Sequence, residues 1–217
     1  MKKGVANTVI ICVAFMAVLV GGVVFRIMHP PAMSRDQLNE NGLFVYEIPR
    51  RFSNFALTDH HGQPFNESNL QGKWTLMFFG YTYCPDICPT TMAALNQFTE
   101  LLADTEYGAD TQVVMVSVDP ERDTVEQMNT YVNFFNPEFT GVTGEYINVF
   151  TLARQLNIAF SYLPSGDEDN PSYDVSHSGE IPLINPNGHF HGFFKNPPQP
   201  EKMVETYSSV REGFGGG

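Results

Sequence analysis

The chain has 217 residues, of which 12 are basic and 24 are acidic, and its formal net charge at neutral pH is −12. Three of the basic residues and none of the acidic ones lie in the first 28 positions, so the remainder carries a formal charge of −15. This balance excludes nucleic acid as an expected partner, and the solubility of an exported domain is enough to explain it. The remainder has the length of one ordinary domain.

The first 28 residues differ in composition from the rest of the chain. Val9 to Phe25 is an uninterrupted apolar run, preceded by Lys2 and Lys3 and closed by Arg26. A run of this length is at the short end of a membrane span, and an arginine at its edge can extend its charged group to the interface. The two lysines predict a cytoplasmic N-terminus, and we expect a single anchor helix, with a cleaved signal peptide as the alternative. The expected organisation in chain order is an anchor, a linker, one domain and a flexible tail: residues 1–28, 29–48, 49–213 and 214–217.

The first element expected in the domain is a β-hairpin over residues 52–65. The turn signal Asp59-His-His-Gly62 divides two weakly alternating stretches. His60 and His61 lie at the tip of this turn. Adjacent turn histidines are usually solvated, and we do not expect these two to hold a metal.

Two continuous apolar runs, Trp74–Phe79 and Gln112–Val118, predict strands that are covered on both faces. The segment between them has helical periodicity and predicts a helix from Thr90 to about Asp104. The order strand, helix, strand favours a parallel unit with a right-handed crossover. In such sheets the chemistry gathers beyond the carboxyl ends of the strands.

The loop that follows the first of these strands carries Cys84-Pro-Asp-Ile-Cys88-Pro. Because a residue before proline avoids the helical region, we expect both cysteines to precede the helix, with Pro89 at its first position. Thiols placed there feel the positive end of the helix dipole, which favours thiolates. Such a pair can cycle between dithiol and disulfide or can bind copper or zinc, and a structural disulfide is the alternative. Asp119, at the end of the second strand, emerges at the same edge of the sheet.

The rest of the chain alternates between helices and extended segments. Its predicted elements are a helix from its cap Asp123 to Phe135, a strand over 139–142, a helix from its cap Thr143 to Leu156, an extended segment over 158–163, a loop over 164–172, a hairpin over 181–194 and a helix over 199–211. Pro182 in the hairpin indicates an edge strand or a bend.

A copper site with two thiolates needs a third ligand, and imidazole suits both oxidation states of the metal. His177 lies in a small polar run just ahead of a strand, although a hydrogen-bonded loop histidine would look the same. His189 and His191 share one face of a strand and are a second possible pair, with surface histidines as the commoner interpretation. The residue pattern alone leaves the choice open.

Several segments together resemble the Sco/SenC family in order and spacing. They are Phe78–Thr90 with both cysteines, Val116–Thr124, Val142–Gly144, Tyr173–Ser178 and Leu183–Gly188, and the similarity extends from about Phe52 to Arg211. The resemblance implies an α/β, thioredoxin-like fold with a central mixed sheet flanked by helices, beside the N-terminal transmembrane helix. It also implies copper, either Cu(I) or Cu(II), held by Cys84, Cys88 and His177, with Asp119 as the acidic residue near the site.

The family further implies a membrane-anchored copper-binding protein that helps to assemble the binuclear copper (CuA) centre of cytochrome c oxidase. The expected partner is the copper-receiving subunit II, with other periplasmic copper chaperones or thiol reductases as further partners. The expected location is the bacterial inner membrane, with the domain in the periplasm. The alternative is a thiol–disulfide reductase that keeps the cysteines of the oxidase copper site reduced, with Cys84 attacking and Cys88 resolving. Whether the chain is an enzyme depends on this choice.

Two positions depart from the family pattern. Ser176 precedes the histidine where relatives often have aspartate, and Tyr83 precedes the first cysteine where a histidine or another polar residue is common. Neither removes a ligand, but both can alter affinity or the choice of partner. A peroxiredoxin is disfavoured because Tyr81 and Met77 occupy the places of its threonine and proline. The three residues between the cysteines leave room for a metal and favour copper handling.

Overall fold

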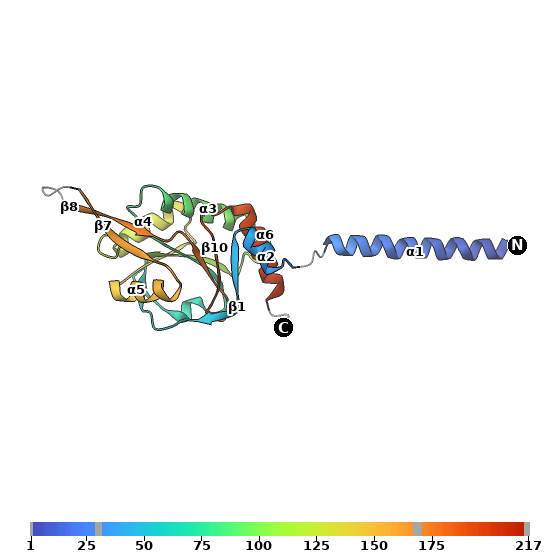
Figure 1. Cartoon of the computed structure of the whole chain (residues 1–217), viewed down its shortest axis with the longest axis horizontal. Helices are drawn as coiled ribbons and strands as arrows, with labels where there is room; N and C mark the ends of the chain where they lie inside the picture. Colours follow the sequence, from blue (N-terminus) through green and yellow to red (C-terminus); the bar gives the residue numbers. More distant parts are fainter. Residues whose placement is uncertain (1, 29–31, 167–170, 215–217) are drawn as a thin grey trace. The chain divides into compact units, whose positions relative to one another are not determined.

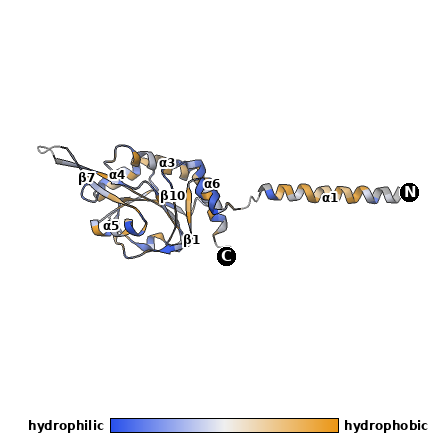
Figure 2. Ribbon diagram, viewed as in Figure 1, coloured by the Kyte–Doolittle hydropathy of each residue, from blue (hydrophilic) through white to orange (hydrophobic). Residues whose placement is uncertain are grey.

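The computed structural model describes residues 2–28, 32–166 and 171–214, and it divides the chain into two compact units that meet between Met33 and Ser34. The first unit contains helix α1 (Lys2–Met28), whose middle part is coloured mainly as apolar in Figure 2. Its segment Asn7–Arg26 is long enough and apolar enough to cross a membrane. The predicted N-terminal apolar helix is therefore present.

The second unit is built on an eight-stranded mixed sheet with the order β1-β10-β9-β4-β5-β6-β2-β3. The strands of this sheet are β1 (Leu43–Arg51), β2 (Leu57–Asp59), β3 (Pro64–Phe65), β4 (Trp74–Gly80), β5 (Thr111–Ser117), β6 (Thr140–Thr143), β9 (Ile181–Ile184) and β10 (His189–Phe194). The three central strands β4, β5 and β6 are parallel, and the flanking pairs are antiparallel. Every residue of β4 is buried, as its continuous apolar run predicts.

Helices cover both faces of this sheet. They are α2 (Arg35–Glu40), the short 3-10 helix η1 (Glu67–Leu70), α3 (Ile87–Leu102), α4 (Val125–Phe135), α5 (Tyr146–Gln155) and α6 (Pro200–Gly213). In Figure 1, α3 and α4 lie on one side of the sheet and α5 lies on the other. Helix α3 buries Met92, Leu95 and Phe98 completely, and each such side chain contributes about 1.5–3 kcal/mol relative to its exposed state. This architecture confirms the predicted fold class.

A separate two-stranded sheet, the β7–β8 hairpin, stands beside the main one. Strand β7 (Phe160–Gly166) pairs with β8 (Pro171–His177) along its whole length, from Phe160 opposite His177 to Gly166 opposite Pro171. The predicted loop over 164–172 is therefore wrong at both ends, because the pairing extends into it. Residues 167–170 of that loop lie outside the described residues.

The predicted linker over residues 29–48 contains regular structure. Ser34 and Gln37 form a reciprocal capping box at the start of α2, and strand β1 begins at Leu43. Leu38 and Leu43 are buried, so this segment packs as part of the second unit. A six-residue helix leaves too short a periodic pattern to be recognised in the sequence.

Two predicted helix caps are wrong because their side chains are buried in the sheet region. Helix α4 is capped by Thr124, whose hydroxyl accepts the backbone N–H of Gln127, while Asp123 is fully buried. Thr143 is the last residue of β6, and α5 begins only at Tyr146. The two hairpins predicted around residues 59–62 and 186–188 are confirmed by the antiparallel pairs β2–β3 and β9–β10.

Pro182 lies in an interior strand, not at an edge or a bend. Strand β9 has β10 on one side and β4 on the other. The pairing with β4 covers Leu183 and Ile184, while Pro182 is paired only with Phe193 of β10. The proline is tolerated because it stands beyond the end of the ladder that would need its N–H.

Candidate metal centre

Cys84 and Cys88 lie beyond the carboxyl end of β4. Cys84 is in the loop, whereas Cys88 is the second residue of α3, so the expectation that both precede the helix is wrong for Cys88. Pro89 is the third helical residue instead of the first, and it is tolerated because the first turn of a helix has no internal acceptor for its N–H groups. The backbone N–H of Cys88 donates instead to the Cys84 sulfur, at 3.4 Å. This hydrogen bond at the start of the helix holds the two cysteines close to each other.

The sulfur of Cys88 rests against the backbone of β4. A Cβ atom on Gly80 would come within 2.9 Å of the Cys88 Sγ and 2.7 Å of the Phe78 ring. Only glycine leaves the sulfur this space at the end of the strand. Cys88 is fully buried here, and Cys84 is 9% exposed, so Cys84 is the more accessible of the two thiols.

His177, at the end of β8, brings an imidazole to the thiols from 89 positions downstream. Its Nε2 lies 3.3 Å from the Cys88 Sγ. Its Nδ1 lies 2.9 Å from the carbonyl oxygen of Ser178, which can only accept, so Nδ1 donates there and Nε2 faces the thiols. The rings of Phe78 and Tyr81 meet the imidazole edge-on, with centroids 6.0 and 6.1 Å away.

The two thiols differ in their affinity for a proton. A hydrogen bond from Cys88 lowers the pKa of Cys84 to about 4, and further hydrogen bonds from His177 and from two backbone N–H groups act in the same direction. The pKa of Cys88 is raised, because its thiol donates to the Cys84 sulfur and because it is buried. The pair therefore holds one shared proton at neutral pH, which a cation bound between the sulfurs would displace.

The donor set fits a soft metal ion. One ligand atom each of Cys84, Cys88 and His177 lies within 4.8 Å of the other two, and this is the one cluster of three such donors in the described residues. Two sulfurs and an imidazole suit copper, whereas magnesium and calcium prefer oxygen ligands. A structural zinc site would ordinarily offer a fourth protein ligand.

Asp119, the acidic residue expected near the site, is fully buried just beyond the end of β5. Its carboxylate forms an ion pair with Arg122 and accepts the hydroxyl of Tyr173 at 2.8 Å. Arg122 also donates to the carbonyl oxygen of Tyr173 at 3.1 Å, and its guanidinium lies 4.0 Å from the centroid of that ring. Tyr173 belongs to β8, the strand that ends in His177. The contacts of Asp119 thus fix the hairpin that carries the imidazole.

Asp123 is the functional residue that the sequence pattern did not identify. Its buried carboxylate accepts the backbone N–H of Thr82 at 3.1 Å, the Thr82 hydroxyl at 2.6 Å and the Ser117 hydroxyl at 2.6 Å. Burial raises its pKa, and these hydrogen bonds act in the opposite direction. Since Thr82 stands two residues before Cys84, Asp123 fixes the thiol loop. The available signal was its place four residues after Asp119, at the same edge of the sheet.

The other histidines of the described residues lie outside this three-residue cluster. His60 is buried in the β2–β3 turn, where its Nδ1 accepts the N–H of Gly141 at 3.1 Å, so it has a structural role that the turn pattern did not indicate. Burial lowers the pKa of His191 to about 4, and its ring packs 5.1 Å from that of Trp74. His61 and His189 likewise contribute no atom to the cluster.

Comparison with known proteins gives a consistent result. The sequence profile of the family described as SCO1/SenC matches residues 48–212. A protein of Stutzerimonas stutzeri that is named as copper-binding is 33% identical over 171 residues, which cover 77% of this chain and 81% of that protein. The mitochondrial SCO2 homologue of Mus musculus is 40% identical over 152 residues, which cover 70% of this chain but only 59% of that protein. The crystal structure of Arabidopsis thaliana ScoI with copper bound superposes with a TM-score of 0.65 at 33% identity, over 73% of this chain and 96% of that one.

Proposed function

Since this chain belongs to the SCO1/SenC family, we propose that it binds copper through Cys84, Cys88 and His177 and delivers it to the binuclear CuA centre of cytochrome c oxidase. The observation that carries this proposal is the convergence of two sulfurs and an imidazole nitrogen within 4.8 Å. The structural relative from Arabidopsis thaliana, which has copper bound, supports the choice of metal.

The protonation of the two thiols and the position of the imidazole favour the binding of copper. The low pKa of Cys84 supplies a thiolate at neutral pH, and the Nε2 of His177 lies 3.3 Å from the second sulfur. Only Cys88 has to release a proton when both sulfurs bind the ion. On delivery, the incoming donors of the acceptor replace these ligands one at a time, beginning at Cys84, which is the more accessible sulfur.

The proposed location is the bacterial inner membrane, with the domain in the periplasm and subunit II of the oxidase as the acceptor. Helix α1 supports this location because its segment Asn7–Arg26 has the dimensions of one membrane span. Lys2 and Lys3, ahead of the span, favour a cytoplasmic N-terminus.

Copper titration of the reduced full-length chain in detergent tests the ligand set. We expect the His177→Ala variant to bind copper about 100-fold or more weakly, a loss of about 2.7 kcal/mol, and to lack the imidazole contribution in electron paramagnetic resonance. His61→Ala is the matched control, because His61 is exposed in the β2–β3 turn. Equal copper affinity in the His177→Ala variant and the unaltered chain would show that this ligand set is wrong.

A second candidate function, thiol–disulfide reduction of the acceptor, is favoured by the lowered pKa of Cys84. The Cys84 thiolate attacks a disulfide of the acceptor, forming a mixed disulfide and releasing one acceptor thiolate. Cys88 then loses its proton and attacks the Cys84 sulfur, which closes the Cys84–Cys88 disulfide and releases the second acceptor thiolate. Two electrons pass to the acceptor in this sequence.

The reductase candidate is tested with the reduced, metal-free chain and an oxidised acceptor. We expect the His177→Ala variant to retain this reaction and the Cys88→Ser variant to accumulate the mixed disulfide, as detected by mass spectrometry. If the unaltered chain transfers no electrons to the acceptor within hours, this candidate is excluded.

A further inference from the structure

A groove with a volume of about 330 Å³ opens directly beside Cys84, between the start of α3 and one side of α4. Most of its walls come from Pro89, Tyr131, Phe134 and Phe135, and Cys84 itself forms part of the lining. Apart from the Cys84 thiolate, its lining residues are uncharged, although the chain after position 28 has a formal charge of −15. An uncharged groove on an acidic domain suits an uncharged ligand.

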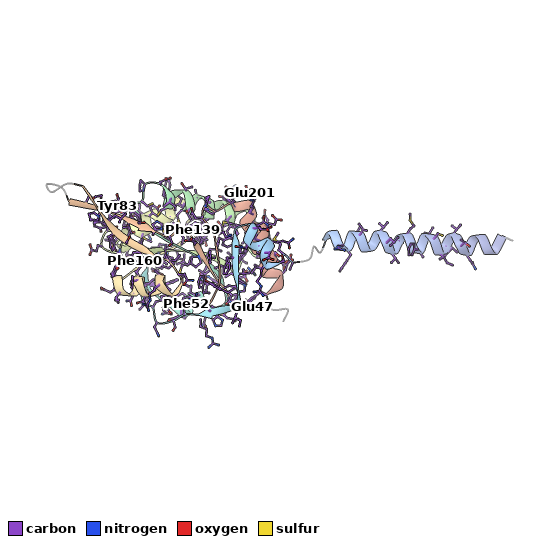
Figure 3. The ribbon with its side chains drawn as sticks, viewed as in Figure 1. Glu47, Phe52, Tyr83, Phe139, Phe160 and Glu201 are labelled. Atoms are coloured by element: carbon purple, nitrogen blue, oxygen red, sulfur yellow. The ribbon has the colours of Figure 1, made fainter. Side chains whose placement is uncertain are left out.

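Aromatic rings form a continuous row along this groove. The ring centroids of Tyr131 and Phe135 are 5.2 Å apart, and those of Phe135 and Phe134 are 5.1 Å apart. Phe134, at the outer end, is 82% exposed. Tyr83, labelled in Figure 3 and next to Cys84 in the sequence, is 57% exposed. The rings therefore offer apolar surface from the solvent to the neighbourhood of the thiol.

The inner end of the row carries a hydrogen-bonding group with no partner. The hydroxyl oxygen of Tyr131 is buried and has no hydrogen-bond partner among the described residues. Such a group costs about 1–3 kcal/mol until an acceptor is supplied. Burial raises the pKa of Tyr131, so its hydroxyl remains a proton donor at physiological pH. A peptide carbonyl oxygen is an acceptor of the required kind.

We propose that this groove is the docking site for a loop of the partner protein that exchanges ligands or electrons with Cys84. An apolar side chain of the loop packs on Phe134 and Phe135, and docking opens the buried hydroxyl of Tyr131 to a backbone carbonyl of the loop. These two contacts direct a donor side chain of the loop to the Cys84 sulfur. The proposal depends on the proposed function for the exchange at Cys84, but not for the docking itself.

The geometry favours a peptide loop over a small charged thiol. Cys88 is fully buried and Cys84 is 9% exposed, so a ligand must enter the groove to reach a sulfur. The groove offers aromatic surface and uncharged polar side chains but no cationic group to bind the carboxylates of a molecule such as glutathione. Apolar packing and main-chain hydrogen bonding together are a common mode of peptide recognition.

The test uses the reduced, metal-free full-length chain in detergent and two uncharged peptides, acetyl-Gly-Phe-Gly-Cys-Gly-amide and the same peptide with Ser in place of Phe. Each peptide is presented as its mixed disulfide with thionitrobenzoate, whose release by Cys84 is followed by absorbance. The thiolate of Cys84 attacks the peptide sulfur, a Cys84–peptide disulfide forms and thionitrobenzoate leaves, so the step needs no other oxidant. We expect the Phe peptide to react about ten-fold faster than the Ser peptide.

The Phe134→Ser variant should lower this ratio to about one without changing the rate with hydroxyethyl disulfide, a small neutral reagent that has no peptide group. Ile48→Ser is the matched control, because Ile48 is 80% exposed on β1 and should leave the ratio at about ten. The Tyr131→Phe variant removes a single oxygen atom and should slow both peptides by about five-fold, again without changing the small reagent.

Equal rates for the two peptides in the unaltered chain, or an unchanged ratio in the Phe134→Ser variant, would overturn the proposal. A Phe134→Ser variant that keeps the ratio but converts a dimer to a monomer, as measured by light scattering, would instead assign the groove to a second copy of this chain. Copper titration of the same variants reports separately on the proposed function. A failure of copper binding is therefore distinguishable from a failure of docking.

Discussion

The thiol loop and the β7–β8 hairpin supply the two halves of the candidate metal centre, and they are held in different ways. The thiol loop continues directly from the buried strand β4 into α3, so covalent connection and core packing fix both sulfurs. The hairpin is a separate two-stranded sheet, which polar contacts attach to the end of β5 and ring contacts of Phe160 and Tyr162 attach to α5. The sulfurs belong to the core of the domain, whereas the imidazole is attached to it.

Two carboxylates that are four residues apart each hold one of the two halves in place. Asp123 binds the thiol loop through Thr82, and Asp119 binds the hairpin through Tyr173 and Arg122. Because each carboxylate holds a different half, we expect that thiol chemistry and copper affinity can be altered separately. Loosening the hairpin should weaken the copper site while leaving a working pair of cysteines.

The largest effect is expected when a sulfur of the core half is removed. The Cys88→Ser variant replaces a soft ligand with a hard hydroxyl, and we expect copper affinity to fall about 1,000-fold or more. Competition with a chromophoric Cu(I) chelator measures the change, and Cys12→Ser in α1 is the matched control. A Cys88→Ser variant that bound copper normally would show that Cys88 is not a ligand.

The next effect concerns stability. The Asp123→Ala variant leaves the backbone N–H of Thr82 and the hydroxyls of Thr82 and Ser117 without their acceptor, and we expect the free energy of unfolding to fall by about 2–4 kcal/mol. Urea denaturation of the metal-free chain measures it, with Asp104→Ala at an exposed position as the control. A loss below about 0.5 kcal/mol would contradict the role of Asp123 in holding the loop.

A smaller and more selective effect is expected in the hairpin half. The Asp119→Asn variant weakens the contacts to Arg122 and Tyr173, and we expect copper affinity to fall about ten-fold because His177 is less well positioned. The midpoint potential of the Cys84–Cys88 disulfide should stay unchanged. The Tyr173→Phe variant should reproduce the direction of the affinity change. A shift in the potential without a loss of affinity would reverse the assignment of Asp119.

The smallest effect distinguishes the two thiols within the core half. Because the pKa of Cys84 is lowered to about 4, its thiolate is fully formed above pH 5, so its alkylation by iodoacetamide should be independent of pH from 6 to 9. The rate should fall only as the pH approaches 4. Cys88, with its raised pKa, should remain unmodified throughout. Peptide mapping by mass spectrometry measures both, and free glutathione, whose rate rises about ten-fold per pH unit below its pKa, is the reference.

The core half could be predicted from the sequence much better than the hairpin half. The apolar run of β4 and the cysteine spacing place the sulfurs at the end of a central strand, because burial and chain connectivity are local signals. His177 was selected by family resemblance and not by its surroundings in the sequence, since its contact spans 89 positions. The β7–β8 hairpin was only half predicted, because its outer part has the composition of a loop.

Asp123 shows why local patterns fail at such sites. An aspartate just ahead of an amphipathic helix predicts a cap, and Thr124 beside it satisfies the same pattern equally well. Burial decided between them, because Asp123 lies under the thiol loop and Thr124 remains exposed. Local pattern contained no information about which residue the tertiary structure would cover.

Gly80 has a consequence for how the domain can change over time. With no side chain at this position, the depth of the Cys88 sulfur is set by main-chain atoms of the central strand, and a methyl group there would force the sulfur to move. A side chain acquired at position 80 would therefore displace a candidate ligand directly, even though the new residue itself had no contact with a metal.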